Sequence, residues 1–322
     1  MIGGLYSELE AFAAILRRGS FTAAAQSLEV TTGAITRRLN GLETRLGVKL
    51  LNRSTRRLSL TESGRHYYDA IAPALAQIES AADLVHELST EPRGELRVSL
   101  PMNFGRLYVM PYLSAFMQRW PGIQLDVHFD DRFVDLIGEG FDLAIRIGAL
   151  TDSRLVARRL ADTRRILVAS PDYLARRGMP QRPGDLVDHD CLHYTHFRGI
   201  ATWEFHRGAE ELHVPVRGRL KSNYGVPLVD AALHGGGIVQ SATFAVAEEL
   251  ASGRLQEVLS DWSLLPIAVH AVYPGRDYRP RKLEVFIEFL ENVIGRPALW
   301  DRLIDGAGQA LALAKTPPVS RT

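Results

Sequence analysis

Residues 19–47 read GSFTAAAQSLEVTTGAITRRLNGLETRLG, the pattern of a short helix, a break and a longer helix. Ser20 is a favoured cap for the short helix and Thr31 for the longer one, because a hydroxyl oxygen can accept a hydrogen bond from a free N–H group of the first turn. Gly47 suits the left-handed conformation that ends many helices. Apolar residues before this stretch recur at spacings of three and four, which indicates a preceding helix. The pattern therefore predicts three helices, the last two forming a helix-turn-helix.

The longer helix has one apolar side and one polar side. Its apolar side consists of Ile35, Leu39, Leu42 and Leu46. Successive residues are about 100° apart around a helix, so the polar side is opposite. That polar side consists of Thr32, Gly33, Thr36, Arg37, Arg38 and Asn40. Hydroxyl, amide and guanidinium groups on such a helix can read base edges and bind phosphates in the DNA major groove. We expect DNA contacts from these residues and from Ser20, Thr22 and Thr31; a three-helix bundle with an ordinary polar surface is the alternative.

Residues 48–60 read VKLLNRSTRRLSL and alternate like two strands joined by a basic tip. The tip contains Arg53, Ser54, Thr55, Arg56 and Arg57. Arginines at the end of a hairpin suit the phosphates or the negative minor groove of DNA, so we predict a DNA-binding wing. Residues 1–60 hold nine Lys and Arg against four Asp and Glu, a formal charge of +5, which leaves −4 for the rest of a chain of net charge +1. Charge alone leaves a basic surface without a partner as the alternative.

A long helix is predicted from Thr61, its cap, to about residue 88. Its apolar stripe contains Tyr67, Ile71, Leu75, Ile78 and Val85, near heptad spacing. A helix between two domains has little of its own protein against which to bury such a stripe. We therefore expect residues 61–92 to form a linker and dimerisation helix followed by a hinge. Packing of the stripe against its own domain is the alternative.

Several short motifs with fixed spacing occur in this N-terminal part. They are GSFTAAA at 19–25 with Leu28, AITR at 34–37, LE at 42–43, LG at 46–47, LNR at 51–53 and TESG at 61–64. Residues 1–60 thereby resemble the DNA-binding domain of bacterial LysR-type transcriptional regulators. One departure lies at 31–33, which read TTG where that family usually has Ser-Gln-Ser or Ser-Gln-Pro. Thr32 in place of an amide removes a bidentate reader of adenine, so the resemblance implies no operator sequence.

From residue 93 the pattern changes to alternating strands and helices with short connections. The first set comprises strands 95–100, 123–129 and 142–147 and helices 106–120 and 132–138. The second comprises strand 165–169, helix 171–177, a strand-rich stretch at 212–222, helix 226–234, strand 237–240 and helix 243–251, and strand 266–273 and helix 281–293 then close the domain. These sets predict two α/β lobes. LRV at 96–98 and FDLAIRIG at 141–148 are similar to the LysR-type effector domain, which implies a bilobed periplasmic-binding-protein-like fold. We expect that domain at 93–295, with lobe I at 93–162 and 266–295, lobe II at 163–265, and a tail at 296–322.

Ligands of such sheets sit beyond the carboxyl ends of the strands, where loops lead into helices. We therefore expect a small-molecule effector to bind between the lobes. The candidate residues are Ser99, Pro101, Met102, Asn103, Phe104, Asp131, Arg132, Arg146, His196, Phe197, Ser222, Asn223 and Ser241. An organic anion is the leading expectation, with a neutral or aromatic ligand as the alternative. Loop capping or lobe packing is the alternative role for each residue.

His189, Cys191 and His193 alternate, and on a strand they would share a face that could hold a metal. One cysteine with scattered histidines is weak support for a metal site. A similar sequence is common in LysR-type effector domains, so we expect no metal and no cofactor. The lone cysteine also lacks a resolving partner for a redox sensor. We find no nucleophile-elbow, zinc-protease or dinucleotide motif, which argues against an enzyme.

Length and composition agree with a two-domain globular protein of the cytoplasm. The chain has 322 residues, of which 46% are hydrophobic. It contains no apolar run of about 18 residues and no secretory signal, so we expect no membrane contact.

The resemblance implies a sequence-specific transcriptional regulator whose DNA binding or promoter activation responds to an effector. It implies a pseudo-palindromic operator in double-stranded DNA and a homodimer or homotetramer, and leaves contact with RNA polymerase open. One alternative is a small-molecule-binding or enzymatic α/β protein whose basic head mediates assembly. The other is a sequence-blind architectural DNA protein, which would leave most of the chain without a role.

Overall fold

The computed structural model describes residues 2–53, 58–86, 91–132, 134–148, 150, 155–195, 202–275 and 279–306. Contacts divide the chain into two compact units. The first contains residues 1–92, 134–142 and 276–281, and the second contains 93–133, 143–275 and 282–322. Each unit has hydrophobic clusters of its own.

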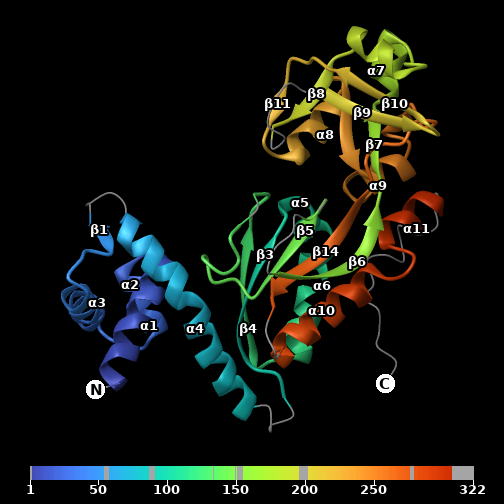
Figure 1. Cartoon of the computed structure of the whole chain (residues 1–322). Helices are drawn as coiled ribbons and strands as arrows, with labels where there is room; N and C mark the ends of the chain where they lie inside the picture. The colour runs from blue at the N-terminus through green and yellow to red at the C-terminus, as the bar shows by residue number, and fades with distance from the viewer. Residues whose placement is uncertain are drawn as a thin grey trace. The chain divides into compact units, whose positions relative to one another are not determined.

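Three helices begin the first unit (Figure 1). They are α1 (Ile2–Arg18), α2 (Phe21–Ser27) and α3 (Thr32–Leu46). Ser20 Oγ accepts a hydrogen bond from the Ala23 N–H at 3.1 Å, and Thr31 Oγ1 accepts one from the Ala34 N–H at 3.2 Å. Gly47 ends α3 with a φ of 69°. Both predicted caps and the predicted end of the longer helix are confirmed.

Apolar residues of these helices and of the following strand form the core of the first unit. Its largest fully buried side chains are Phe12, Ile15, Ile35, Leu39, Leu42 and Leu50. The strands β1 (Leu51–Arg53) and β2 (Leu58–Leu60) pair antiparallel. Leu51 lies opposite Leu60, as a hairpin requires, while the predicted tip at 54–57 lies outside the described residues.

The helix α4 (Glu62–His86) follows the wing, and its first half packs on this core. Leu75 is only 5% exposed, and the ring of Tyr67 lies 6.4 Å from that of Phe12 between centroids. Ile71 is partly buried in the same cluster. For these three residues of the predicted dimerisation stripe, the structure supports the alternative of packing within the chain.

The second half of the α4 stripe is different. Ile78 is 49% exposed. The side chain of Val85 lies outside the described residues. A surface for another subunit on α4 would therefore begin at Ile78.

The second unit contains two five-stranded sheets, one in each predicted lobe. The lobe I sheet has the order β4-β3-β5-β14-β6. Its strands are β3 (Gly94–Leu100), β4 (Ile123–Phe129), β5 (Leu143–Ile147), β6 (Leu155–Thr163) and β14 (Ile267–Pro274). Two helices pack on it, α6 (Met110–Arg119) and α10 (Arg281–Ile294) (Figure 1). The rings of Phe116 and Phe286 join these helices at 5.1 Å between centroids.

The lobe II sheet has the order β11-β8-β12-β7-β13. Its strands are β7 (Arg165–Ala169), β8 (Cys191–Tyr194), β11 (Lys221–Ser222), β12 (Ile238–Ala242) and β13 (Gln256–Val258). The surrounding elements are α7 (Pro171–Arg177), the 3-10 helix η2 (Pro183–Asp188), the hairpin of β9 (Thr202–Arg207) and β10 (Glu210–Pro215), α8 (Gly225–Leu233) and α9 (Thr243–Ala251). Apolar residues of α7, η2 and the hairpin form one cluster, and those of α8 belong to another.

The lobes are joined where β6 leads into β7, with only Arg164 between the two strands. The hydroxyls of Thr163 and Thr243 lie 2.9 Å apart, and the Arg164 N–H donates to Thr243 Oγ1 at 3.1 Å. From this point α9 contributes Phe244 to the lobe I core and Val246 to the lobe II core. The predicted pair of α/β lobes joined by crossing segments is therefore present.

Two predicted helices of lobe I differ in the structure. The helix predicted at 106–120 begins earlier, because α5 (Met102–Phe104), a π-helical turn η1 (Gly105–Val109) and α6 are continuous. The helix predicted at 132–138 is wrong, since residues 136–140 form turns. Asp135 Oδ1 accepts the Gly138 N–H at 3.1 Å, and Gly140 has a φ of 69°. A local side-chain bond and a left-handed residue both compete with a helix there.

Four of the described strands were missed by the prediction. β8 was considered only as a strand on which His189, Cys191 and His193 would share a face. β6 is polar and largely exposed, an edge strand whose pattern lacks a buried face. β9 carries the alternation of a half-buried strand but lay outside the stretch predicted as strand-rich. β13 is only three residues long.

The last described helix is α11 (Leu299–Asp305), inside the predicted tail. Trp300 anchors it, because its side chain is fully buried and its Nε1–H donates to the Asp162 carbonyl at 3.2 Å. Among the described helices, none is long and apolar enough to span a membrane.

Candidate nucleic-acid interface and effector site

The outer side of α3 is polar and accessible, as predicted. Thr32, Gly33, Arg37 and Asn40 are exposed, whereas Ile35 and Leu39 on the inner side are fully buried. Thr36 is half-buried, and its hydroxyl donates to the Thr32 carbonyl at 2.9 Å. The same periodicity that builds the core therefore presents hydroxyl, amide and guanidinium groups on one surface.

Residues at the starts of α2 and α3 lie beside this surface. Ser20, Thr22 and Thr31 are all exposed. The Ser20 and Thr31 oxygens accept the capping bonds, so each hydroxyl keeps its O–H to donate. These helix starts also leave backbone N–H groups that favour anions such as phosphate.

Adjacent arginines of α3 have different environments. Arg37 is exposed on the outer side. Arg38 is half-buried, with Nη1 4.0 Å from the Glu10 carboxylate of α1. Farther along α3, Arg45 forms an ion pair of 3.1 Å with Glu8 of α1. Arg38 and Arg45 thus pair α3 with α1, whereas Arg37 lies exposed on the outer side of α3.

Part of the predicted wing is defined. Arg53 ends β1 opposite Leu58, but its side chain lies outside the described residues. The same holds for Ser54, Thr55, Arg56 and Arg57.

The parallel strands of each lobe bring predicted effector residues to one sheet edge. In lobe I, β3 pairs parallel with β4 and β5, so the ends of these strands lie together. In lobe II, β8 pairs parallel with β11 and β12. Ser222 lies opposite Tyr194 at the lobe II edge.

Hydrogen bonds fix the lobe I edge. Asp131 Oδ1 accepts the Met102 N–H at 2.9 Å. Arg146 is 7% exposed, and its Nη1 donates to the Arg132 carbonyl at 2.6 Å. Arg132 itself pairs with Asp130 at 2.6 Å. Arg146 thus supports the loop after β4 from beneath.

Tyr194, at the end of β8 in lobe II, is influenced by Asp131 of lobe I and was missed by the sequence analysis. Burial raises the pKa of its hydroxyl, as do the charge of Asp131 and a hydrogen bond to that carboxylate. Tyr194 ends β8 and comes directly before the predicted loop, so its place at a strand end was the available signal.

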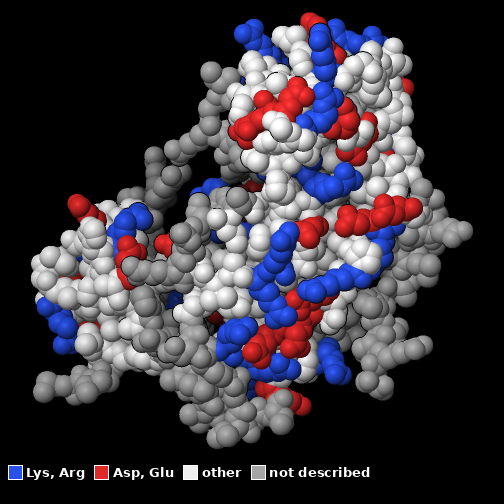
Figure 2. All heavy atoms as spheres, turned by 45° about the vertical axis from the view of Figure 1, so that its right-hand side comes forward, with Lys and Arg blue, Asp and Glu red and all other residues white. Residues whose placement is uncertain are grey.

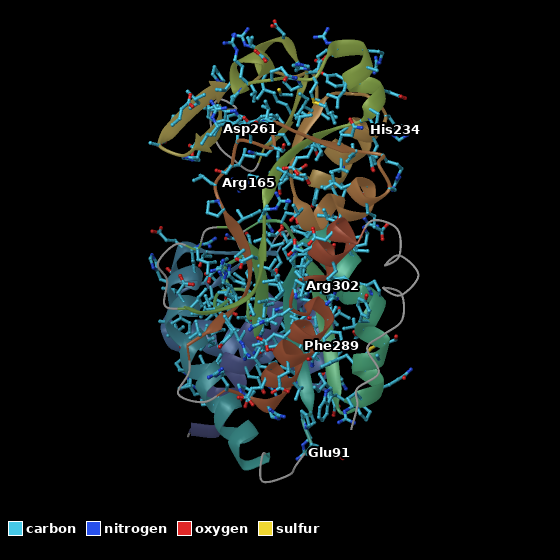
Figure 3. The ribbon with its side chains drawn as sticks, turned by 90° about the vertical axis from the view of Figure 1, so that its right-hand side faces the viewer. Glu91, Arg165, His234, Asp261, Phe289 and Arg302 are labelled. Atoms are coloured by element: carbon cyan, nitrogen blue, oxygen red, sulfur yellow. The ribbon has the colours of Figure 1, made fainter. Side chains whose placement is uncertain are left out.

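A second missed residue is Arg165, labelled in Figure 3, which starts β7 directly after the crossing between lobes. Burial lowers the pKa of its guanidinium, and the negative charge of Glu204 opposes that shift. A desolvated arginine interacts strongly with carboxylates. Its position one residue after Arg164, at a predicted strand start, gave no sign of burial.

Some predicted effector residues have other roles or lie elsewhere. Ser99 is buried within β3. Phe104 is fully buried, with its ring 5.5 to 6.3 Å from three other aromatic rings, and does not line an accessible surface. Pro101 and Asn103 are half-buried, and Asn103 Oδ1 accepts a bond from Arg106 at 3.2 Å.

Lobe II supplies the remaining predicted residues. Ser222 Oγ accepts the Tyr224 N–H at 3.0 Å, and Asn223 is exposed. Ser241 is half-buried on β12. His196 and Phe197 lie outside the described residues.

The histidines around Cys191 serve the structure of lobe II. His189 lies outside β8, and its Nδ1 is 3.1 Å from the Tyr173 hydroxyl. Burial raises the pKa of the Cys191 thiol to about 12, as does the nearby charge of Asp190. Within the described part of the chain, no group of three or more His, Cys, Asp or Glu residues is arranged to hold a metal ion.

Charge is distributed differently over the second unit. On the face shown in Figure 2, basic and acidic side chains are interleaved over the second unit. Ion pairs of the second unit include Arg158 with Glu291 at 2.7 Å and Arg164 with Glu257 at 3.7 Å. The face in view therefore lacks the one-sided basic character that attracts DNA.

Comparison with known proteins agrees with both units. Residues 6–65 match the family described as bacterial regulatory helix-turn-helix protein, lysR family, and residues 89–294 match the LysR substrate binding domain.

The HTH-type transcriptional regulator PtxR of Pseudomonas aeruginosa is 36% identical over 292 residues, which cover 90% of this chain and 93% of PtxR. The transcriptional activator TtdR of Escherichia coli K12 is 36% identical over 299 residues, covering 91% of this chain and 96% of TtdR. The solved structure of CrgA, a LysR-type regulator from Neisseria meningitidis, is 33% identical with a TM-score of 0.58, covering 88% of this chain and 97% of CrgA. The chain therefore belongs to the LysR family of bacterial helix-turn-helix transcriptional regulators, which bind DNA and are not enzymes.

Proposed function

We propose that this protein is a sequence-specific DNA-binding regulator controlled by a small organic anion bound between lobes I and II. The observation that carries the DNA-binding part is the exposed polar side of α3, formed around Arg37 and Asn40 on a fully buried apolar stripe. The effector part rests on the two sheet edges that Asp131 and Tyr194 bring into contact.

The buried Arg146 and the half-buried Arg165 favour an anion. Arg146 holds the loop after β4 through the Arg132 carbonyl, and Arg165 stands at the lobe crossing. A guanidinium group that is partly removed from water is a better partner for a carboxylate than for a neutral ring.

Regulation requires that the effector bind two arrangements of the lobes with different affinity. The crossing at Thr163 and Thr243 offers such a place, because few residues join the lobes there. A change at this crossing would alter how two subunits present their α3 helices to the halves of a pseudo-palindromic operator. We place this action in the cytoplasm, and contact with RNA polymerase would be one route to promoter activation.

Ligand titration tests the effector proposal. Small carboxylates and neutral aromatic compounds are added to the full-length protein, and its thermal unfolding midpoint is followed. A carboxylate should raise the midpoint, and Asn103→Ala should weaken that response. Gln118→Ala, at an exposed position of α6, should leave the response unchanged. A response to neutral compounds alone, or an undiminished response in Asn103→Ala, would contradict the proposed ligand class or its placement.

A further inference from the structure

The backbone of Leu50 joins the DNA-reading helix to the linker helix. Its N–H donates to Glu43 Oε1 of α3 at 3.0 Å. Its carbonyl accepts from the Thr61 N–H at 3.0 Å and lies 3.2 Å from the Thr61 hydroxyl. The N–H and the carbonyl of the fully buried Leu50 thus connect α3 with the start of α4.

Glu43 is a buried carboxylate on a helix whose other inner residues are apolar. It is 3% exposed. Its second oxygen accepts from the Lys49 ammonium at 2.6 Å, and Oε1 also lies 3.4 Å from the Leu51 N–H. Burial alone would raise the pKa of Glu43, but the Lys49 side chain and the two backbone N–H groups outweigh it and hold this pKa below its usual value. The charged carboxylate therefore holds the segment 49–51 that leads into the first strand of the wing.

Thr61 makes the corresponding contacts on the other side of Leu50. Its hydroxyl donates to the Lys49 carbonyl at 2.7 Å and accepts the Gly64 N–H at 2.9 Å, so it caps α4 while it holds the strand. Gly64 is buried, and a Cβ there would overlap the Leu50 carbonyl oxygen. The first turn of α4 therefore lies directly against the backbone of Leu50.

We propose that Glu43 and Thr61 are positioning residues that set DNA affinity without touching DNA. They fix the wing and α4 on α3 through Leu50, so that a displacement of the linker helix carries the reading helix with it. Glu43 holds the N–H of Leu50, and Thr61 holds its carbonyl. These hydrogen bonds link α3 to the first turn of α4 through the backbone of a single buried residue. The inference rests on the proposed use of α3 in DNA binding.

Amide exchange in the full-length protein tests the connection without DNA. Thr61→Val keeps the shape of the side chain and removes its hydroxyl, and Thr61→Ser restores the hydroxyl. Thr61→Val should speed exchange of the Leu50 N–H, although Glu43 and not Thr61 accepts that proton, and Thr61→Ser should resemble wild type. Unchanged Leu50 exchange in a folded Thr61→Val protein would overturn the proposal.

DNA affinity tests the consequence. Duplex DNA from the region upstream of the protein's own gene is titrated with wild type, Glu43→Gln, Thr61→Val, the double variant and the exposed control Glu62→Gln. Glu43→Gln should weaken binding about tenfold, because its hydrogen bonds involve a charged group, and Thr61→Val should weaken binding about fivefold, because its hydrogen bonds are to neutral backbone groups. The double variant should lose less than the product of both, because the two residues act through Leu50. Affinities equal to wild type would refute the positioning role, whereas absence of binding by wild type with altered amide exchange would count against the proposed DNA function and leave the connection itself supported.

Discussion

Cys191 shows how burial determines the chemistry of one side chain in this protein. Its thiol is fully buried, and Sγ lies 3.7 Å from the Leu186 carbonyl. The raised pKa of about 12 keeps the thiol protonated in the folded protein at physiological pH. Since the thiolate is the nucleophile, the native protein should react slowly with iodoacetamide at pH 8.

The same shift predicts a pH dependence of stability. The thiol ionises near 9 when unfolded and near 12 when folded, so unfolding releases a proton between these values. The free energy of unfolding should therefore fall from about pH 9 upward, by at most about 1.4 kcal/mol per pH unit from this group. Urea unfolding at pH 8 and pH 10 measures it, and Cys191→Ala should show a smaller loss. Equal losses in both proteins would contradict the assignment.

Single residues differ in how well the sequence predicts them. Ser20 and Thr31 were predicted as caps because capping depends on local chain geometry. Glu43 and Tyr194 were missed because their partners are backbone groups or loops elsewhere in the fold. Arg37 and Arg38 could not be told apart by periodicity, since the contact of Arg38 with α1 depends on helix packing.

At the level of elements, α3 and α4 were predictable because caps and apolar spacing indicate the same structure. The segment at 132–138 has helical spacing, but the Asp135 side chain and the left-handed Gly140 produce turns. β6 was not predictable, since an exposed edge strand has no buried face to produce alternation. The π-helical turn η1 likewise has no periodicity of its own at a length of five residues.

The start of α4 gives a prediction at this scale. Gly64→Ala places a methyl group where the Leu50 carbonyl oxygen lies, so the helix must shift away from the wing. The loss of stability should be about 1–3 kcal/mol, the usual cost of overpacking a well-filled site. Chemical denaturation measures it. Gly225→Ala, where nothing lies within 4 Å of the new Cβ, is the control and should be near neutral.

At the scale of the molecule, alternating strands and helices with short connections predicted two α/β lobes. The predicted lobe boundary at 162/163 falls within β6, which ends at Thr163 before β7 begins at Arg165. The meeting of Asp131 with Tyr194 was not predictable, because it depends on how two separately patterned sheets are joined. The effector residues therefore remain proposals, whereas the architecture around them follows from local pattern.

Assembly supplies the next prediction at this scale. Among the described side chains of the predicted α4 dimerisation stripe, Ile78 is exposed. Ile78→Asp should weaken self-association by placing a charge in an apolar contact. Sedimentation of the full-length protein should show a dimer or larger species for wild type and more monomer for the variant. Identical sedimentation of the two proteins would remove Ile78 from the interface.

DNA binding by the outer side of α3 is measured most directly by competition. The full-length protein is titrated against DNA from upstream of its own gene in excess nonspecific competitor, with Arg37→Ala and the control Arg219→Ala, which removes the same charge from an exposed site in lobe II. Loss of one good base contact corresponds to about 1–3 kcal/mol, so Arg37→Ala should bind roughly tenfold more weakly or worse. Arg219→Ala should bind like wild type. Specific binding that is unaffected by Arg37→Ala would contradict the assigned surface, and absence of specific binding to any genomic fragment would contradict the proposed regulator itself.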